Sequence, residues 1–162
     1  KNAMRLTTMT DYAMRLLMYV AQKPERLCTI AEVASAYGIS EAHLMKITHQ
    51  LARHGWLATV RGKGGGMRLA AAPCDINLGA VVRTIEPDFY LVDCLTGGAA
   101  CSLAGNCRLT GIMSGALQSL MHYLDAYTLA DLLQPMPPGG ASCAPLPAAP
   151  TGRLQKIALV AQ

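Results

Sequence analysis

Three cysteines lie close together in the second half of the chain. Cys94, Cys101 and Cys107 fall within 14 residues, with six residues between the first pair and five between the second. Thiolates on one loop can wrap a multi-iron cluster, because soft sulfur ligands suit iron–sulfur chemistry. Structural zinc usually binds ligand pairs separated by about two to four residues, and no such cysteine pair occurs here. The spacing therefore favours an iron–sulfur cluster over structural zinc.

A cluster with four iron corners needs a fourth ligand besides these three cysteines. It must come from elsewhere in the chain, from a partner chain or from a small molecule, and the candidates within the chain are Asp11, Asp93 and His122. The three remaining cysteines are Cys28, Cys74 and Cys143. They are isolated in sequence, so we expect ordinary packed or exposed thiols there.

A second group of residues has the chemistry of nucleic-acid binding. His43, Lys46, Gln50 and Arg53 follow one another at helical spacings of three, four and three, and further cations flank a glycine-rich turn. Such donors can reach phosphates and base edges if their helix enters a major groove, although a charged stripe is also typical of a solvated helix face. Its position after a helix-turn favours DNA binding. The predicted DNA-contacting residues are Ser40, His43, Lys46, Gln50, Arg53, Arg61, Lys63 and Arg68.

The charge distribution supports this division of roles. Residues 1–70 contain ten Lys or Arg and four Asp or Glu, a net charge of +6, whereas residues 71–162 contain four and six, a net charge of −2. A nucleic-acid-binding module needs its phosphate attraction on one side only. The asymmetry is typical of a DNA-binding module joined to a non-binding one, and chance clustering of surface charge would also produce it.

The elements that position the basic residues follow from periodicity and capping signals. Apolar residues recur at helical spacing from about residue 10 to 22, and Thr29 with Glu32 forms a capping box that begins a second helix. Gly38 ends that helix and Ser40 can begin a third. Two strands are expected at residues 56–60 and 67–70 around the turn 61–66, which lacks the residues of a nucleotide-binding loop. This order predicts a winged helix-turn-helix.

The second half is expected to contain a loop between helices. A fourth helix should end before Pro87, residues 88–106 lack a sustained period, and an apolar face then recurs over about 18 residues from Arg108. That face is wider than one small neighbour would cover, so a second copy of the chain is its expected partner. Thr128 and Asp131 begin a short helix, and six prolines between residues 135 and 150 indicate an irregular tail.

The predicted fold is mainly α-helical with a small β-hairpin wing, a winged helix-turn-helix followed by a long dimerisation helix. The predicted regions are 4–72 for the DNA-binding part, 73–107 for the connecting helix and cluster loop, 108–134 for the dimerisation and short helices, and 135–162 for the tail.

Several classes of protein are disfavoured by the sequence. Hydrophobic residues make up 52% of the chain, but no apolar run approaches the roughly 18 residues of a membrane span. The first residues lack the apolar stretch of a secretory signal, so we expect a cytoplasmic protein. No catalytic constellation of nucleophile, base or metal-binding helix stands out, and an enzyme is the weaker hypothesis.

These features resemble the bacterial Rrf-two-type winged-helix regulators, the family that includes IscR and NsrR. The resemblance spans about residues 4–134 and is most specific in Met4–Thr7, Thr10–Tyr12, the wing Val60–Gly66 and the three-cysteine loop. Thr128–Leu132 is similar to the nitric-oxide-sensing NsrR branch.

The resemblance implies a ligand set and a function. IscR-type members use a His three residues beyond the last cysteine, where this chain has Thr110, whereas NsrR-type members have an Asp at the position of Asp11. It thus implies a homodimer with a 4Fe-4S cluster held by Cys94, Cys101, Cys107 and Asp11 of the other subunit. The implied function is a repressor that binds an inverted-repeat operator in double-stranded DNA and releases it when nitric oxide attacks the cluster.

Three alternatives remain at the level of sequence. The same DNA-binding dimer could respond to redox state or iron–sulfur supply through a 2Fe-2S cluster, or through a cluster-free thiol switch. A small iron–sulfur carrier or assembly protein is the third, and the +6 charge of residues 1–70 argues against it.

Overall fold

The structure is a computed structural model that describes residues 7–86 and 108–133. Its first helix, α1 (Thr8–Ala21), buries one face with relative exposures of 0–1% at Ala13, Leu16, Leu17 and Val20. These are the positions predicted from the helical period. The helix begins two residues earlier than the expected residue 10, because Thr7 already has the extended backbone of an N-cap.

The next two helices form the helix-turn-helix. The helix α2 (Ile30–Tyr37) begins with the predicted capping box, in which the Thr29 hydroxyl accepts from the Glu32 N–H and the Glu32 carboxylate accepts from the Thr29 N–H. It ends at Gly38, whose φ of 65° lies in the left-handed region that favours glycine. The helix α3 (Glu41–Arg53) follows after the buried Ile39.

A β-hairpin follows α3 and forms the wing. Strands β1 (Leu57–Val60) and β2 (Gly66–Leu69) pair antiparallel, with Leu57 opposite Leu69 and Thr59 opposite Met67. Met67 also exchanges backbone hydrogen bonds of 2.8 and 2.9 Å with Cys28, just before α2. These two bonds fasten the wing to the helix-turn-helix.

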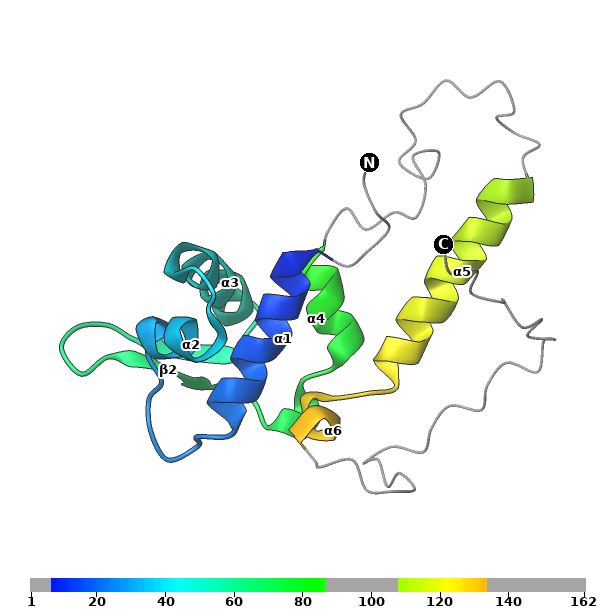
Figure 1. Cartoon of the computed structure of the whole chain (residues 1–162). Helices are drawn as coiled ribbons and strands as arrows, with labels where there is room; N and C mark the ends of the chain where they lie inside the picture. Colours follow the sequence, from blue (N-terminus) through cyan, green and yellow to red (C-terminus); the bar gives the residue numbers. More distant parts are fainter. Residues whose placement is uncertain (1–6, 87–107, 134–162) are drawn as a thin grey trace.

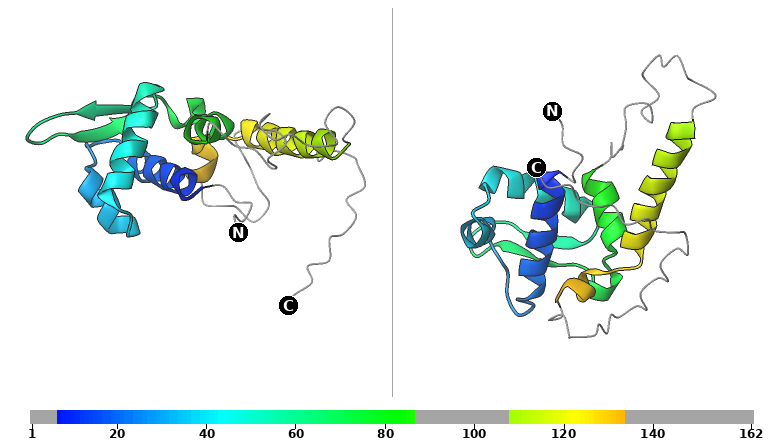
Figure 2. Two further views of the ribbon diagram at one scale, coloured as in Figure 1. Left: turned by 90° about the horizontal axis from the view of Figure 1, so that it is seen from above. Right: turned by 45° about the vertical axis from the view of Figure 1, so that its right-hand side comes forward.

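The remaining described elements are η1 (Pro73–Asp75), α4 (Leu78–Ile85), α5 (Arg108–Asp125) and α6 (Leu129–Leu133). In Figure 1, α1 lies at the centre, with α2, α3 and the hairpin on one side and α4 on the other. The helix α5 extends away beyond α4, and the view from above in Figure 2 shows it at the opposite end of the molecule from the wing. The wing and the long helix are therefore separated in space.

One hydrophobic core holds the first part together. Most of its buried members come from α1, α2, α3, the hairpin and α4, and α6 adds Leu129, which is 0% exposed. The predicted mainly α-helical fold with a hairpin wing is confirmed, and α5 has the expected length of 18 residues. The expected loop 88–106 and the tail 135–162 lie outside the described residues.

Candidate functional site

The helix α3 presents a surface because its opposite face is fixed in the core. Leu44, Ile47 and Leu51 are each 0% exposed, and Thr48 on the same face is 6% exposed. The Thr48 hydroxyl contacts the Met67 sulfur at 3.7 Å, which joins α3 to β2. Most of the remaining side chains of α3 are exposed and available to a bound molecule.

The predicted polar stripe on α3 is brought together only in part. His43, Lys46 and Arg53 are exposed, and the His43 ring lies 6.0 Å from the Tyr12 ring of α1. Gln50 is half-buried, and its Oε1 is buried without a hydrogen-bond partner among the described residues. Ser40 occupies the N-cap position, but its side chain makes no capping hydrogen bond. Gln50 is therefore less accessible to a bound molecule than the other residues of the stripe.

The outermost row of α3 contains residues that the sequence stripe omitted. Ala42, Lys46, His49 and Arg53 are all exposed and succeed one another at spacings of four, three and four. Met45 is beside this row and is 56% exposed. The row follows from the buried face: the outward positions are those opposite Leu44, Ile47 and Leu51, and a search for polar residues alone does not find Ala42 or Met45.

The turn of the wing carries two of the three predicted cations. Arg61 and Lys63 are exposed between the strands, and the turn requires glycine because Gly62 and Gly64 have φ of 94° and 77°. Arg68 instead lies within β2, opposite Ala58. The strand register therefore separates Arg68 from the other two.

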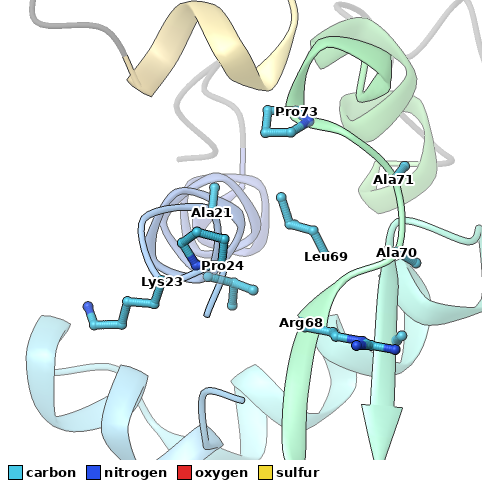
Figure 3. Close-up of a pocket in the computed structure, with 10 residues that line it drawn as sticks. Ala21, Lys23, Pro24, Arg68, Leu69, Ala70, Ala71 and Pro73 are labelled. Atoms are coloured by element: carbon cyan, nitrogen blue, oxygen red, sulfur yellow. The ribbon is translucent and has the colours of Figure 1, made fainter. Parts of the chain in front are cut away.

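Arg68 lines a cavity together with a second cation. The cavity has a volume of about 520 Å³ and lies between the end of α1 and the hairpin. Figure 3 shows Lys23 and Arg68 on opposite sides of it, with Pro24 between them. The Lys23 ammonium lies 3.5 Å from the centre of the Tyr19 ring, so a cation–π contact holds one wall of the cavity.

The start of α2 is held by a group of polar side chains. The Glu32 carboxylate accepts hydrogen bonds from Arg26 and, at 2.8 Å, from the Tyr19 hydroxyl of α1. The Arg26 guanidinium, and then the Tyr19 hydroxyl, lower the pKa of Glu32 to about 2. Because α2 and α3 are packed together, this group also fixes the orientation of α3 relative to α1.

Of the four implied cluster ligands, Asp11 is the one within the described residues. It lies in the first turn of α1, and its carboxylate accepts a hydrogen bond from Arg15 Nε at 2.8 Å, with both side chains about half exposed. An exposed carboxylate oxygen is a chemically suitable iron ligand. Cys94, Cys101, Cys107 and the candidate Asp93 lie outside the described residues. Within residues 7–86 and 108–133, no group of three metal-binding side chains occurs.

The residue before the undescribed segment is bonded to the start of α1. Glu86 Oε1 accepts hydrogen bonds from the Thr7 N–H at 2.8 Å, from the Thr7 hydroxyl and from the Thr10 hydroxyl. Thr7 provides no side-chain cap of its own, and Glu86, 79 residues away, accepts from the N–H of this N-cap residue and holds the start of the helix. It connects the turn that carries Asp11 to the chain that leads toward Cys94.

The helix α5 is docked at its C-terminal end. Arg83 of α4 makes two 2.7 Å bonds to the Asp125 carboxylate, and Asn77 Nδ2 donates to the Asp125 carbonyl at 2.7 Å. The Arg83 guanidinium lowers the pKa of Asp125. The closest α4 position is Gly79, where a Cβ would overlap the Asp125 carboxylate. The end of α5 is thus fitted closely to α4.

Along the rest of α5, one side of the helix is uncovered. No residue of this helix is buried, and Leu109, Ile112, Leu120 and Tyr123 are 38–65% exposed along one side. Met113, Leu117, Met121 and Leu124 are half-buried on the adjoining side. The predicted apolar face is present, and in the single chain it is exposed on one side and half-buried on the other. The candidate ligand His122 is on α5 and exposed.

The other described cysteines differ in environment. Cys28 is 0% exposed, and burial raises the pKa of its thiol, which keeps it protonated at neutral pH. Its side chain packs in the hydrophobic core. Cys74 is exposed on η1, and Cys143 is outside the described residues. Among residues 7–86 and 108–133, no helix combines the length and hydropathy of a membrane span.

The fold and the exposed, basic α3 surface define a winged helix-turn-helix protein. Residues 6–135 match the Rrf2 family, described as iron-dependent transcriptional regulators, and the chain belongs to that family. The transcriptional regulator NsrR of Halalkalibacterium halodurans is 44% identical over 132 residues, which cover 80% of this chain and 90% of that protein. NsrR of Bacillus subtilis is 41% identical over 133 residues, or 81% and 91% of the two chains.

Solved structures give the same fold. T. potens IscR is 26% identical with a TM-score of 0.62, and the match covers 80% of this chain and 85% of that one. A putative transcriptional regulator from Listeria innocua is 23% identical with a TM-score of 0.67, over 82% and 88% of the two chains. The sequence-based assignment to this family is confirmed, and transcriptional regulation is the activity that the family defines.

Proposed function

We propose that the protein is a homodimeric cytoplasmic repressor that binds an inverted-repeat operator and releases it in response to nitric oxide through an iron–sulfur cluster. The observation that carries the proposal is the separation of two different surfaces at opposite ends of the molecule. A basic recognition surface lies at one end, an uncovered apolar helix lies at the other, and Asp11 is exposed on α1 between them.

The DNA-binding part of the proposal rests on α3 and the wing. In a winged helix-turn-helix, the second helix of the turn enters the major groove and the wing contacts the backbone or the minor groove. Lys46 and Arg53 on α3 and Arg61 and Lys63 on the wing are exposed and supply the positive charge. His43 and His49 add hydrogen-bond donors for base edges or phosphates.

The dimer is supported by the uncovered face of α5. Exposed leucine, isoleucine and tyrosine side chains along 18 residues form an apolar stripe that a second copy of the same helix would cover. A two-fold axis at α5 would relate two recognition helices far from that axis. Such a dimer matches an operator made of two inverted half-sites.

The sensor part rests on the donor set and on the relatives named NsrR. Cys94, Cys101 and Cys107, with Asp11 from the partner subunit, would hold the cluster, and the bound cluster would supply irons that react with nitric oxide. Three thiolates and one carboxylate would give each of the four irons of a 4Fe-4S cluster one protein ligand. A carboxylate is a weaker and more exchangeable iron ligand than a thiolate, so the iron bound by Asp11 would be the one that nitric oxide reaches most easily. Arg15 is placed to accept the Asp11 carboxylate as an ion-pair partner when that carboxylate is not a ligand.

The described contacts provide a route from Asp11 to α3. Glu86 fixes the first turn of α1, and the buried face of α1 packs against α3 in the same core. A shift of α1 on release of Asp11 would therefore alter the position of the recognition helix. Because Asp11 would reach across the dimer, one such change would affect both half-sites.

Anaerobic purification with iron and sulfide counts, followed by nitric-oxide titration of operator binding, tests the proposal. We expect about four irons per chain and loss of binding as nitric oxide is added. Asp11→Ala should retain thiolate-bound iron but weaken the link between nitric oxide and DNA release, whereas Glu25→Ala, at an exposed position beyond the other end of α1, should respond normally. Two irons per chain, or none, would instead support the 2Fe-2S or thiol-switch alternatives, and an unchanged response of Asp11→Ala would contradict the proposed route.

A further inference from the structure

Exposed large apolar side chains occur at both ends of the described structure. Five belong to α5 and α6, namely Leu109, Ile112, Leu120, Tyr123 and Leu132. The proposed dimer accounts for those on α5. Met45 and Val60 are at the other end, on α3 and on β1 beside the wing turn. Of these two, Met45 lies on the helix that the proposed function places in the major groove.

Met45 is the exception among the large apolar residues of α3. Leu44, Ile47 and Leu51 are each 0% exposed, whereas Met45 is 56% exposed and takes no part in the hydrophobic core. It is the fifth residue of the helix, within the N-terminal half from which helix-turn-helix proteins contact base edges. Its side chain is therefore available to a ligand rather than to packing.

The surroundings of Met45 favour DNA as that ligand. Lys46 is adjacent, His49 is one turn further along and Arg53 is a second turn further, and all three are exposed. These cations and donors attract phosphates and bring the helix into a groove. An apolar protein partner would require a continuous apolar patch, but the neighbours of Met45 on this surface are polar or small.

The chemistry of the groove then defines the contact. A thioether cannot pair with a phosphate, and the thymine C5-methyl is the apolar group that base edges present in the major groove. Methionine is unbranched and flexible, which suits contact with a methyl group whose position varies with local DNA geometry. We propose that Met45 contacts the C5-methyl of a thymine and thereby selects a T·A pair at one position of each operator half-site. This inference rests on the proposed function and assigns part of its sequence specificity.

The size of the effect can be anticipated. Burial of one methyl group corresponds to about a fourfold change in affinity. Because the dimer would make the contact once in each half-site, removal of both methyl groups should weaken binding roughly 15-fold. Replacement of thymine by uracil removes this methyl and leaves the Watson–Crick pairing intact.

The experiment uses the full-length, cluster-loaded protein under anaerobic conditions. A random duplex pool is first selected for binding, and each thymine of the selected half-site is then replaced by uracil, symmetrically in both halves. We expect a roughly 15-fold loss at one thymine position, measured by fluorescence anisotropy. Met45→Ala should bind the thymine duplex more weakly and show no difference between thymine and uracil there.

Two further variants sharpen the test. Val60→Ala, which shortens the other exposed apolar side chain at this end, should retain the thymine preference. Met45→Gln should select an adenine instead at the same position, because a glutamine amide pairs with the adenine edge. A selected duplex whose binding is insensitive to every uracil replacement, or a Met45→Ala variant that keeps the preference, would overturn the inference. Failure to select any duplex would contradict the proposed function itself.

Discussion

The DNA-binding part and the helix α5 differ in how far their apolar side chains are buried. Residues 7–86 pack most of their large apolar side chains into one core, with Met45 and Val60 as exposed exceptions, and α1 alone buries Ala13, Leu16, Leu17 and Val20. The 18 residues of α5 bury none, although leucine, isoleucine and methionine recur along them. The first part has internal partners for most of its apolar residues, whereas the exposed apolar side of α5 would be covered only by the second subunit of the proposed dimer.

The largest effect is expected in the core of the DNA-binding part. Leu16→Ala removes a side chain that is 0% exposed at the centre of α1, and the resulting cavity should lower the free energy of unfolding by about 3–4 kcal/mol. Chemical denaturation monitored by circular dichroism measures this change. Leu109→Ala is the matched control, because that leucine is 55% exposed in the single chain, and the measurement on it should be made at a concentration that favours the monomer. Equal destabilisation by both variants would contradict the comparison.

The next effect concerns assembly. Ile112→Asp places a charge on the uncovered stripe of α5, where the side chain is 65% exposed, and should convert the dimer to a monomer with operator affinity reduced about 100-fold. Light scattering after gel filtration and anisotropy measure the two changes, and the circular dichroism spectrum should stay helical. Gln118→Asp, exposed on the opposite side of α5, should remain dimeric. A dimeric Ile112→Asp variant would show that another surface joins the subunits.

The sequence predicted most of the fold because its signals are local. Thr29, Glu32 and Gly38 act within one or two turns of the helix that they cap, and the spacing of Leu44, Ile47 and Leu51 is enough to define a buried face. The long helix was predicted in the same way.

The candidate site was predicted less fully because it depends on contacts between distant residues. The burial of Gln50 and the separation of Arg68 from the wing turn follow from packing and strand register, and neither is visible in residue type. The hydrogen bonds between Glu86 and the start of α1 join residues 79 positions apart, beyond the reach of a local sequence signal.

A smaller effect is expected at the wing. Arg61→Ala and Lys63→Ala should each weaken operator binding several-fold. Each should also reduce the slope of log affinity against log salt concentration by about one for a lost phosphate contact. Affinity measured over a series of potassium chloride concentrations gives the slope. Arg68→Ala is the comparison, because Arg68 lines the cavity beside Lys23 and not the wing turn. A larger change in slope for Arg68→Ala than for the two wing variants would show that Arg68, and not the wing turn, contacts the phosphates.

The smallest effect concerns the pH dependence of stability. The pKa of Glu32 is lowered from 4.5 to about 2 in the folded protein, so its contribution to stability is present above about pH 4.5 and is lost as the pH falls toward 2. Glu32→Gln should therefore be less stable than the parent at pH 6, and the difference should shrink toward pH 2. Thermal unfolding at several pH values measures it, with Glu25→Gln as the charge-matched control. A difference that stays constant over this range would show that the charge of Glu32 is not involved.

Because α5 is fixed, among the described residues, only at its C-terminal end, a rotation of the helix about Asp125 moves its N-terminal end the most. An 18-residue helix is about 27 Å long, so a rotation of roughly 5° at the pivot displaces the far tip by about 2 Å. That displacement exceeds the range over which a hydrogen bond keeps its strength. The bonds of Arg83 and Asn77 to Asp125 hold the C-terminal end of α5 in one orientation and therefore limit the displacement of its N-terminal end.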